Sequence, residues 1–397
     1  MIRVRPEKWK LPRNVIALGL VSLFNDASSE IIYPLLPLFL IGALGAGPAF
    51  VGLIEGVTES ASSLLNLPAG WLSDRIRRRK GLVLFGYGLA SLARPGLAMA
   101  GAAWHVMGLR LVDRIGKGAR SGPRDALIAD SSPPEARGIA FGFHRAMDHL
   151  GAIVGALLSA WLLGLFNGDF RRVFWAASIP ALIAVSILIF AVRETPIEPA
   201  AEAARKAVDP NPPIRFTGNF KGYLAALLLF TLGNSSDAFL LLRAWQAGIG
   251  VTSIPLLWAA LHLSKSVFSL LGGGMSDRLG RKRLIVSGWI VYAVIYLAFA
   301  AASTPPHIWA LFLCYGIYFG LTEGVEKAFV ADLTAPQMRG SAFGLYNLII
   351  GIGALPASLL TGWLWQRFGA ETALGAGAIV SLLAAAMLLF VREERKR

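Results

Sequence analysis

Long apolar runs recur along the whole chain and are separated by short polar connections. Each run has roughly 20 residues, the length that a helix needs to cross a hydrocarbon core of ~30 Å. Transmembrane strands would be shorter and would alternate apolar and polar positions. We expect the runs to begin near residues 14, 49, 81, 103, 138, 170, 219, 250, 284, 307, 340 and 371. The pattern predicts an all-α polytopic membrane protein with twelve transmembrane helices.

Composition agrees with a chain surrounded by lipid, because 55% of the residues are hydrophobic and 16% are charged. The 38 Lys and Arg exceed the 24 Asp and Glu, which in a soluble protein would suggest nucleic-acid binding. Here the basic residues gather between apolar runs, so we expect no nucleic-acid partner.

The basic clusters also predict the topology. They lie at residues 3–13, 75–80, 278–283 and 392–397, and the positive-inside rule assigns such clusters to the cytoplasm. An even number of helices then places both termini there. The first run is too long for a cleavable signal, so it is interpreted as the first helix. We expect a multi-pass monomer in the plasma (inner) membrane.

Two motifs occur twice at nearly one spacing. GWLSDRIRRRK (70–80) returns as GGMSDRLGRKR (273–283), and ADSSPPEARGIAFG (129–142) returns as ADLTAPQMRGSAFG (331–344). Such repetition indicates an internal duplication with two parallel six-helix halves. We expect an N-terminal bundle at 1–192, a Pro-rich cytoplasmic linker at 193–218 and a C-terminal bundle at 219–397.

The first of these motifs resembles the loop signature of the major facilitator superfamily. GGMSDRLGRK (273–282) matches it closely, whereas the first copy has Arg77 where the family usually has Gly. RIGKG (114–118) resembles the family's fourth-helix motif, with Lys in place of a common Gln. GAIVGA (151–156) is similar to its antiporter motif but lacks the Pro.

The resemblance implies two pseudo-symmetric bundles that carry a solute by alternating access. It also implies a gating role, in which the signature residues stabilise one access state. These residues are Asp74, Arg75, Asp277 and Arg278. The alternative is that they are solvated loop charges.

Carboxylates on the first two helices are candidates for proton coupling. Asp26 and Glu30 lie four residues apart and share one helix face, just before two prolines that interrupt the helical hydrogen bonds. Charges inside a membrane are costly, so they are expected in a wet cavity or beside a partner. We expect Glu59 in the cavity and Glu55 near the outer headgroups. The alternative is that an Arg neutralises the helix-one pair, which then only locks the bundle.

The fourth helix carries a charged stripe, because Asp113, Lys117, Arg120 and Arg124 follow one another at steps of three or four, with Arg114 beside them. Such a stripe can bind an anionic solute through the guanidinium forks. Alternatively, the last two Arg extend to the cytoplasmic headgroups.

The fifth helix pairs His144 with Asp148, which can extend a proton relay. A plain ion pair between Arg145 and Asp148 is the alternative. We expect Arg114 to be neutralised by a fixed carboxylate such as Asp26 or Asp148. The alternative is that the substrate itself supplies the anion.

The second half offers weaker candidates for the cavity. They are Asp237, Arg243, His262, Lys265, Glu323 and Glu326. The scattered His and carboxylates have no metal-ligand spacing, so no metal site is expected. No phosphate-binding Gly loop and no nucleophile with a paired base occur, so we expect no cofactor, no ATP-driven transport and no enzyme.

These patterns together predict a secondary transporter of a small-molecule substrate, coupled to protons and embedded in the lipid bilayer. Efflux is the first interpretation. Uptake or exchange of an anionic metabolite is the alternative within transport, and a non-transporting membrane receptor is the alternative outside it.

Overall fold

The structure is a computed structural model that describes residues 11–76, 79–133, 136–194, 216–334 and 339–392. The described residues before and after the gap at 195–215 form two halves, and both halves are built from helices. The N-terminal half contains α1 (Arg13–Ile32), α2 (Leu36–Leu38), α3 (Pro48–Ile76), α4 (Arg79–Met99), α5 (Ala103–Asp130), α6 (Arg137–Leu165), α7 (Phe170–Ala176) and α8 (Ser178–Phe190). The C-terminal half contains α10 (Gly218–Gly233), α11 (Ala238–Gln246), α12 (Ile254–Leu279), α13 (Arg281–Ala301), α14 (Pro305–Asp332), α15 (Arg339–Phe368) and α16 (Ala370–Leu389).

These helices form the twelve predicted crossings within the described part of the chain. Ten segments are long and apolar enough to span a bilayer, with α7 and α8 forming one of them and α10 and α11 another. The other two crossings are α3 and α5, which have 29 and 28 residues and carry the charged positions. Each crossing begins within three residues of its expected position.

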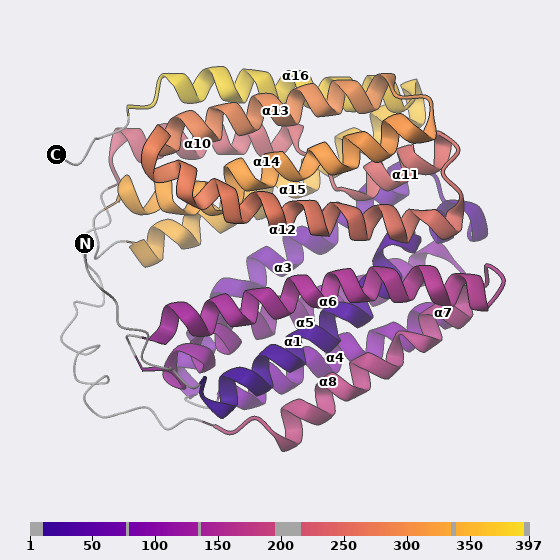
Figure 1. Ribbon diagram of the computed structural model, residues 1–397, viewed down its shortest axis with the longest axis vertical. Helices are drawn as coiled ribbons and strands as arrows, with labels where there is room; N and C mark the ends of the chain where they lie inside the picture. Colours follow the sequence, from indigo (N-terminus) through magenta and orange to yellow (C-terminus); the bar gives the residue numbers. More distant parts are fainter. Residues whose placement is uncertain (1–10, 77–78, 134–135, 195–215, 335–338, 393–397) are drawn as a thin grey trace.

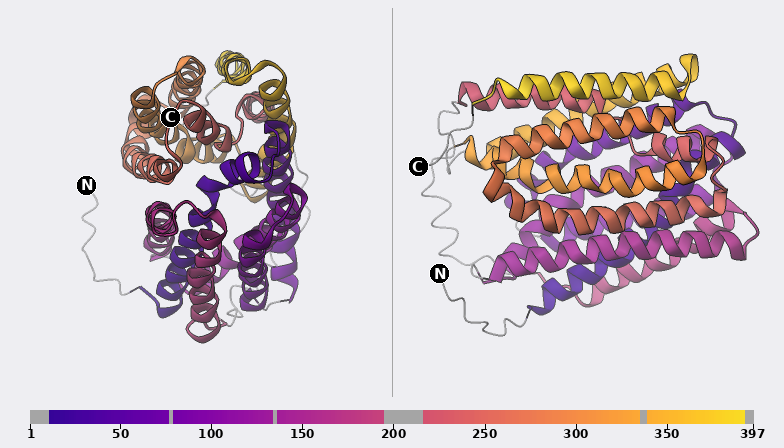
Figure 2. Two further views of the ribbon diagram at one scale, coloured as in Figure 1. Left: turned by 90° about the vertical axis from the view of Figure 1, so that its right-hand side faces the viewer. Right: turned by 45° about the horizontal axis from the view of Figure 1, so that its top comes forward.

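The two halves lie side by side with their helices roughly along one direction, and the start of α1 and the end of α16 lie on the same side (Figures 1 and 2). The main contacts between the halves are those of α3 with α15 and of α6 with α12. We call the side with the start of α1 and the end of α16 the terminal side, and the opposite side the far side. Most of the expected linker, 193–218, lies outside the described residues, so the domain boundaries stay a prediction.

The first crossing of each half is interrupted. After α1, a 3-10 turn occupies Tyr33–Leu35 and a π-helical turn occupies Phe39–Ala43. Two prolines in this stretch, Pro34 and Pro37, cannot donate backbone hydrogen bonds, which explains the loss of regular helix. In the second half, residues 234–237 between α10 and α11 are not helical.

The two interruptions contact each other. The hydroxyl oxygens of Tyr33 and Ser236 lie 3.5 Å apart. These residues are 203 positions apart, the same spacing as that between Asp74 and Asp277 in the repeated motif. Equivalent positions of the two halves therefore meet in the middle of the molecule.

Close packing within the N-terminal half explains the glycines of the antiporter-like motif. α6 runs along α1, and a Cβ added at Gly155 would overlap the carbonyl oxygen of Ala27. Small residues let two membrane helices approach to backbone contact.

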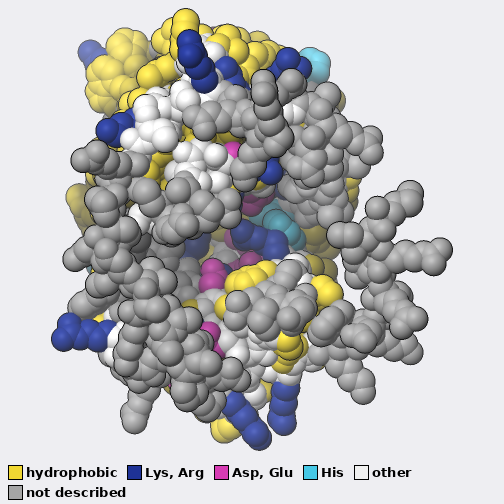
Figure 3. All heavy atoms as spheres, turned by 90° about the vertical axis from the view of Figure 1, so that its left-hand side faces the viewer, with side chains coloured by type: hydrophobic (Ala, Val, Ile, Leu, Met, Phe, Trp, Pro, Cys, Tyr) yellow, Lys and Arg dark blue, Asp and Glu magenta, His cyan; other side chains and the backbone are white. Residues whose placement is uncertain are grey.

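The far side is sealed by contacts between the first part of α3 and the last part of α15. A Cβ added at Gly52 would overlap the carbonyl oxygen of Ser358, and the backbone N–H of Ala49 donates to Oε1 of Gln366 at 3.2 Å. On the terminal side, the surface is hollow at its centre, with Lys, Arg, Asp, Glu and His side chains visible in the hollow (Figure 3). The structure is therefore open on the terminal side and closed on the far side.

Candidate functional site

Charged side chains of the N-terminal half surround a central cavity of about 260 Å³, which we call the basic cavity. Seven Lys and Arg line it, whereas the carboxylates number four. The basic residues are Arg94, Arg110, Arg114, Lys117, Arg120, Arg124 and Arg145. The carboxylates are Asp26, Glu30, Asp113 and Asp148. The cavity thus has an excess of positive charge.

A second cavity of about 490 Å³ adjoins it, which we call the aromatic cavity. Its carboxylates are Glu55, Glu59, Asp237, Glu323 and Glu326, and its basic residues are Arg114 and Lys327. Its aromatic residues are Tyr33, Phe230, Tyr315, Tyr318, Phe319 and Tyr346. Because Tyr33 and Arg114 line both cavities, they stand at the junction between them.

The helix-one carboxylates both line the basic cavity, as expected from their shared helix face. Asp26 accepts a hydrogen bond of 2.9 Å from Nδ2 of Asn25, whose Oδ1 accepts one of 2.7 Å from Arg94. Glu30 accepts a hydrogen bond of 2.7 Å from Nε1 of Trp258 on α12, a residue of the other half. Within the described residues neither carboxylate has a direct ion pair with an Arg, so the locking alternative is not what the geometry shows.

The stripe on α5 divides into paired and unpaired cations. Arg110 lies 3.6 Å from Glu55 and 3.7 Å from Asp113. Arg120 is 7% exposed and lies over the ring of Tyr87 at 4.4 Å, and its Nη1 has no hydrogen-bond partner among the described residues.

Arg114 has no ion pair with Asp26 or Asp148 among the described residues, and the carboxylate that acts most strongly on its charge is Glu59. In the described part of the chain, neither Arg114 nor Lys117 has a carboxylate within ion-pair distance, and Nε of Arg114 is buried without a partner. Asp148 is engaged elsewhere, because Ser22 and helix α6 supply its partners.

Asp148 contacts both residues that were considered as its partner on the fifth helix, His144 and Arg145. Nδ1 of His144 lies 3.6 Å from Oδ2 of Asp148, and Nη1 of Arg145 lies 3.7 Å from the same oxygen. The hydroxyl of Ser22 donates to Asp148 from α1. Asp148 and Arg145 line the basic cavity, whereas His144 is buried beside it.

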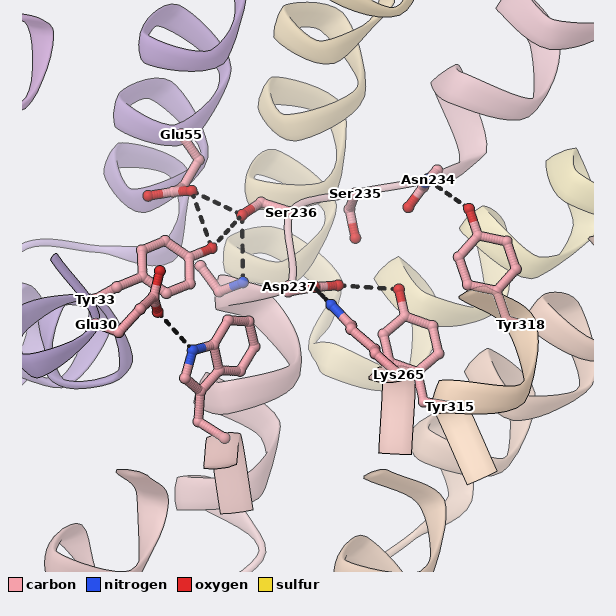
Figure 4. Close-up of polar contacts among 12 residues, drawn as sticks. Glu30, Tyr33, Glu55, Asn234, Ser235, Ser236, Asp237, Lys265, Tyr315 and Tyr318 are labelled. Carbon is pink, nitrogen blue, oxygen red and sulfur yellow. Dashed lines mark hydrogen bonds and ion pairs between the residues drawn. The ribbon is translucent and has the colours of Figure 1, made fainter. Parts of the chain in front are cut away.

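The expected position of Glu55 near the headgroups is wrong. Its side chain is buried and lines the aromatic cavity together with Glu59. Oε2 of Glu55 accepts hydrogen bonds from Ser236 at 2.9 Å and from Tyr33 at 3.4 Å, as Figure 4 shows. Because Ser236 belongs to the other half, Glu55 joins the two halves at their interrupted helices.

The second half places most of its candidates around the two cavities. Oδ1 of Asp237 accepts from the hydroxyl of Tyr315 at 2.9 Å, and Oδ2 lies 3.2 Å from Nζ of Lys265 (Figure 4). Glu326 accepts hydrogen bonds from Trp289 at 3.0 Å and from Tyr346 at 2.8 Å. Two other candidates also have cavity positions: Glu323 lines the aromatic cavity and His262 lines the basic cavity.

Arg243 does not belong to the cavities, contrary to expectation. Its guanidinium donates to the carbonyl oxygens of Phe299, Ala300 and Ala302 at 2.8–3.0 Å. These are carbonyls at the end of α13, which have no partner within the helix. The role of Arg243 is therefore to cap α13 at the far side.

Comparison with known proteins tests the resemblance noted in the sequence. The family model of the Major Facilitator Superfamily matches residues 18–264 and 238–397. An uncharacterised MFS-type transporter of Methanocaldococcus jannaschii is 33% identical over 388 residues, which cover 96% of each chain. The chain belongs to the Major Facilitator Superfamily.

More distant members of the superfamily are also similar. A multidrug resistance protein of Edwardsiella ictaluri is 21% identical over 349 residues, covering 85% of this chain and 82% of that protein. The crystal structure of a bacterial homologue of the human lysosomal transporter Spinster, inward-facing and occupied, superposes with a TM-score of 0.79 at 16% identity. The superposition covers 95% of this chain and 96% of the other. This superfamily protein is a multi-pass secondary transporter and not an enzyme.

The superfamily signature lies at helix ends. Arg75 is in the last turn of α3 and is exposed. The side chains of Asp74, Asp277 and Arg278 lie outside the described part of the structure, so the gating role stays a prediction.

Sequence reasoning missed two cavity cations, Arg94 and Arg110. Arg94 is a lone charge in an apolar stretch of α4, and Arg110 extends the charged stripe of α5 by one turn before Arg114. The cost of a charge in the membrane would have singled out both residues. The hydrogen bond from Trp258 to Glu30 could not be predicted from a local sequence pattern, because the two residues are 228 positions apart.

Proposed function

We propose that this superfamily member is a proton-coupled exporter of a small organic anion. The observation that carries the proposal is the set of cations on α5 that line the basic cavity and have no ion pair with a carboxylate of the described residues. They are Arg114, Lys117 and Arg120.

Cations in this position need an anion. Placing a charge within a membrane protein costs several kcal/mol unless an opposite charge or water compensates it. Arg110 has such compensation from Glu55 and Asp113. Arg114 and Lys117 make no ion pair with a described carboxylate and share the more distant charge of Glu59, which leaves an excess of positive charge. A carboxylate or phosphate that enters from the terminal side would fit the guanidinium fork of Arg114.

Proton coupling is proposed for the helix-one carboxylates, because one of them joins the two halves. A hydrogen bond to an ionised carboxylate is stronger than one to a neutral carboxyl group. Protonation of Glu30 would weaken the contact that Trp258 makes across the halves. Proton occupancy would then bias the equilibrium between the closed and the open far side.

Asp26→Asn and Glu30→Gln test this coupling. We expect each variant to lose flux driven by a pH gradient while substrate exchange continues, since a neutral side chain keeps its shape but cannot carry the proton. If both single variants and the double variant retain full gradient-driven flux, the proposed proton site is wrong.

We also propose that both termini are cytoplasmic, so that the terminal-side opening faces the cell interior. The named role of the Edwardsiella relative in multidrug resistance supports export. Cysteine at position 210, in a chain with Cys314→Ser, should react with an impermeant thiol reagent only after the inner face is exposed. Labelling of intact cells from outside would contradict this topology.

The substrate class is tested in everted vesicles with labelled organic anions, labelled cations and labelled neutral solutes. We expect saturable, pH-gradient-dependent accumulation of anions, and we expect Arg114→Ala to abolish it. Arg172→Ala is the matched control, because Arg172 is exposed and pairs with Asp169 outside the cavities. Accumulation of cations or neutral solutes alone, or undiminished anion flux in Arg114→Ala, would contradict an anionic substrate.

A further inference from the structure

The two adjoining cavities differ in the charges that they leave unpaired. On the N-terminal side of the junction, Arg114 and Lys117 have no carboxylate partner among the described residues. On the C-terminal side, Glu323 on α14 lines the aromatic cavity, and the described contacts give it neither a hydrogen bond nor an ion pair. The unpaired cations and this unpaired carboxylate thus belong to opposite halves.

The other carboxylates of the aromatic cavity are already engaged or compensated. Glu55, Asp237 and Glu326 accept hydrogen bonds from fixed donors. Glu59 stands on α3 in the half that carries the cations, and its charge acts on Lys117 and Arg114, so it compensates one of these two cations. Lys327 lines the same cavity but lies one turn beyond Glu323 towards the terminal side and is exposed. Glu323 is therefore the carboxylate of the C-terminal half that is free to meet a cation.

The aromatic rings around this carboxylate suit a cation as well. Nζ of Lys265 lies 3.6 Å from the centre of the Phe319 ring, so an ammonium group already packs against one ring that lines the cavity. Tyr33 at the junction and Tyr315 and Phe319 on α14 line this cavity. Aromatic faces with a nearby carboxylate are a typical site for ammonium groups.

We propose that the substrate is amphoteric, with an anionic group held by Arg114 and Lys117 and an ammonium group held by Glu323 and the rings of the aromatic cavity. This inference rests on the proposed anion transport and specifies its substrate class. A ligand with both groups contacts both halves at once, whereas a plain anion engages the N-terminal half alone. Binding of the amphoteric ligand would therefore add its contacts across the interface that moves during transport.

Matched probes test the proposal on the purified full-length protein. Straight-chain carboxylates of four to eight carbons are compared with the ω-amino acids of the same length by thermal shift and by displacement. We expect an ω-amino acid of at least one length to bind about 10-fold more tightly than its plain carboxylate, as one added charge-assisted contact provides. Glu323→Gln should remove this advantage without weakening the binding of the plain carboxylate, because the change takes away a negative charge that repels it.

The control is Glu371→Gln, because Glu371 lies at the far side and lines neither cavity. It should keep the advantage of the ω-amino acids in full. If plain carboxylates bind as tightly as the ω-amino acids at every length, the amphoteric substrate is wrong while anion transport stands. If no member of either series binds, the proposed anion site and this inference fail together.

Discussion

The basic cavity and the aromatic cavity both contain charged side chains, but the two cavities differ in whether these side chains have partners. In the aromatic cavity, three carboxylates accept hydrogen bonds from Trp, Tyr or Ser, and Asp237 also has Lys265 beside it. In the basic cavity, the cations of α5 lie near one another, and Arg114 and Lys117 have no carboxylate partner in the described structure. Charges of the first kind stabilise the fold, whereas charges of the second kind are the ones that we propose bind a ligand. The number of charges in a cavity therefore says less about its function than the partners do.

The largest effect is expected for Asp237→Asn in the aromatic cavity. This change leaves the charge of Lys265 without its partner, which should lower the free energy of unfolding by about 3 kcal/mol, as for other poorly hydrated ion pairs. Melting of the purified protein without ligand measures it. The double variant with Lys265→Met should recover most of the loss. A single variant that melts like the wild type would contradict the structural role of this pair.

A smaller effect separates two Arg residues of the basic cavity. Arg94 donates to Oδ1 and to the carbonyl oxygen of Asn25 and is buried, so Arg94→Ala should cost about 2 kcal/mol. Arg114→Ala should change the stability of the ligand-free protein by less than about 0.5 kcal/mol. Equal losses of stability in the two variants would show that Arg114 has a fixed partner after all.

The smallest effect compares two Trp–Glu hydrogen bonds. Trp258 donates to Glu30 across the halves, whereas Trp289 donates to Glu326 within one half. Trp258→Phe should weaken the closed far side by about 1 kcal/mol, which is about a 5-fold shift in population. Spin labels at positions 46 and 371 in a Cys314→Ser chain measure the far-side distance distribution.

Trp289→Phe is the matched control and should leave that distribution unchanged, although it removes the same kind of bond. If both variants shift the distribution equally, the bond to Glu30 has no special part in closing the far side.

The sequence predicted the crossings well, because length and hydropathy are local properties. The starts of α5 and α7 agree with the expected positions to the residue. Asp26 and Glu30 were placed in one cavity for the same reason, since residues four apart share a helix face.

The partners of these charges could not be predicted, because they come from distant parts of the chain. Glu55 was expected near the headgroups, but Ser236 and Arg110 hold it in the interior. Arg243 was expected in the cavity, but the end of α13 lies within its reach. Hydropathy gives the depth of a residue only roughly and says nothing of which helix lies opposite.

The missing side chain at Gly52 offers a way to trap the molecule in its other state. The far side closes only because nothing stands between this position and the carbonyl oxygen of Ser358. The methyl group of Gly52→Ala would clash with α15 when the far side closes, and it would leave every charge of both cavities in place. Such a variant would be a practical starting point for determining the structure with the far side open.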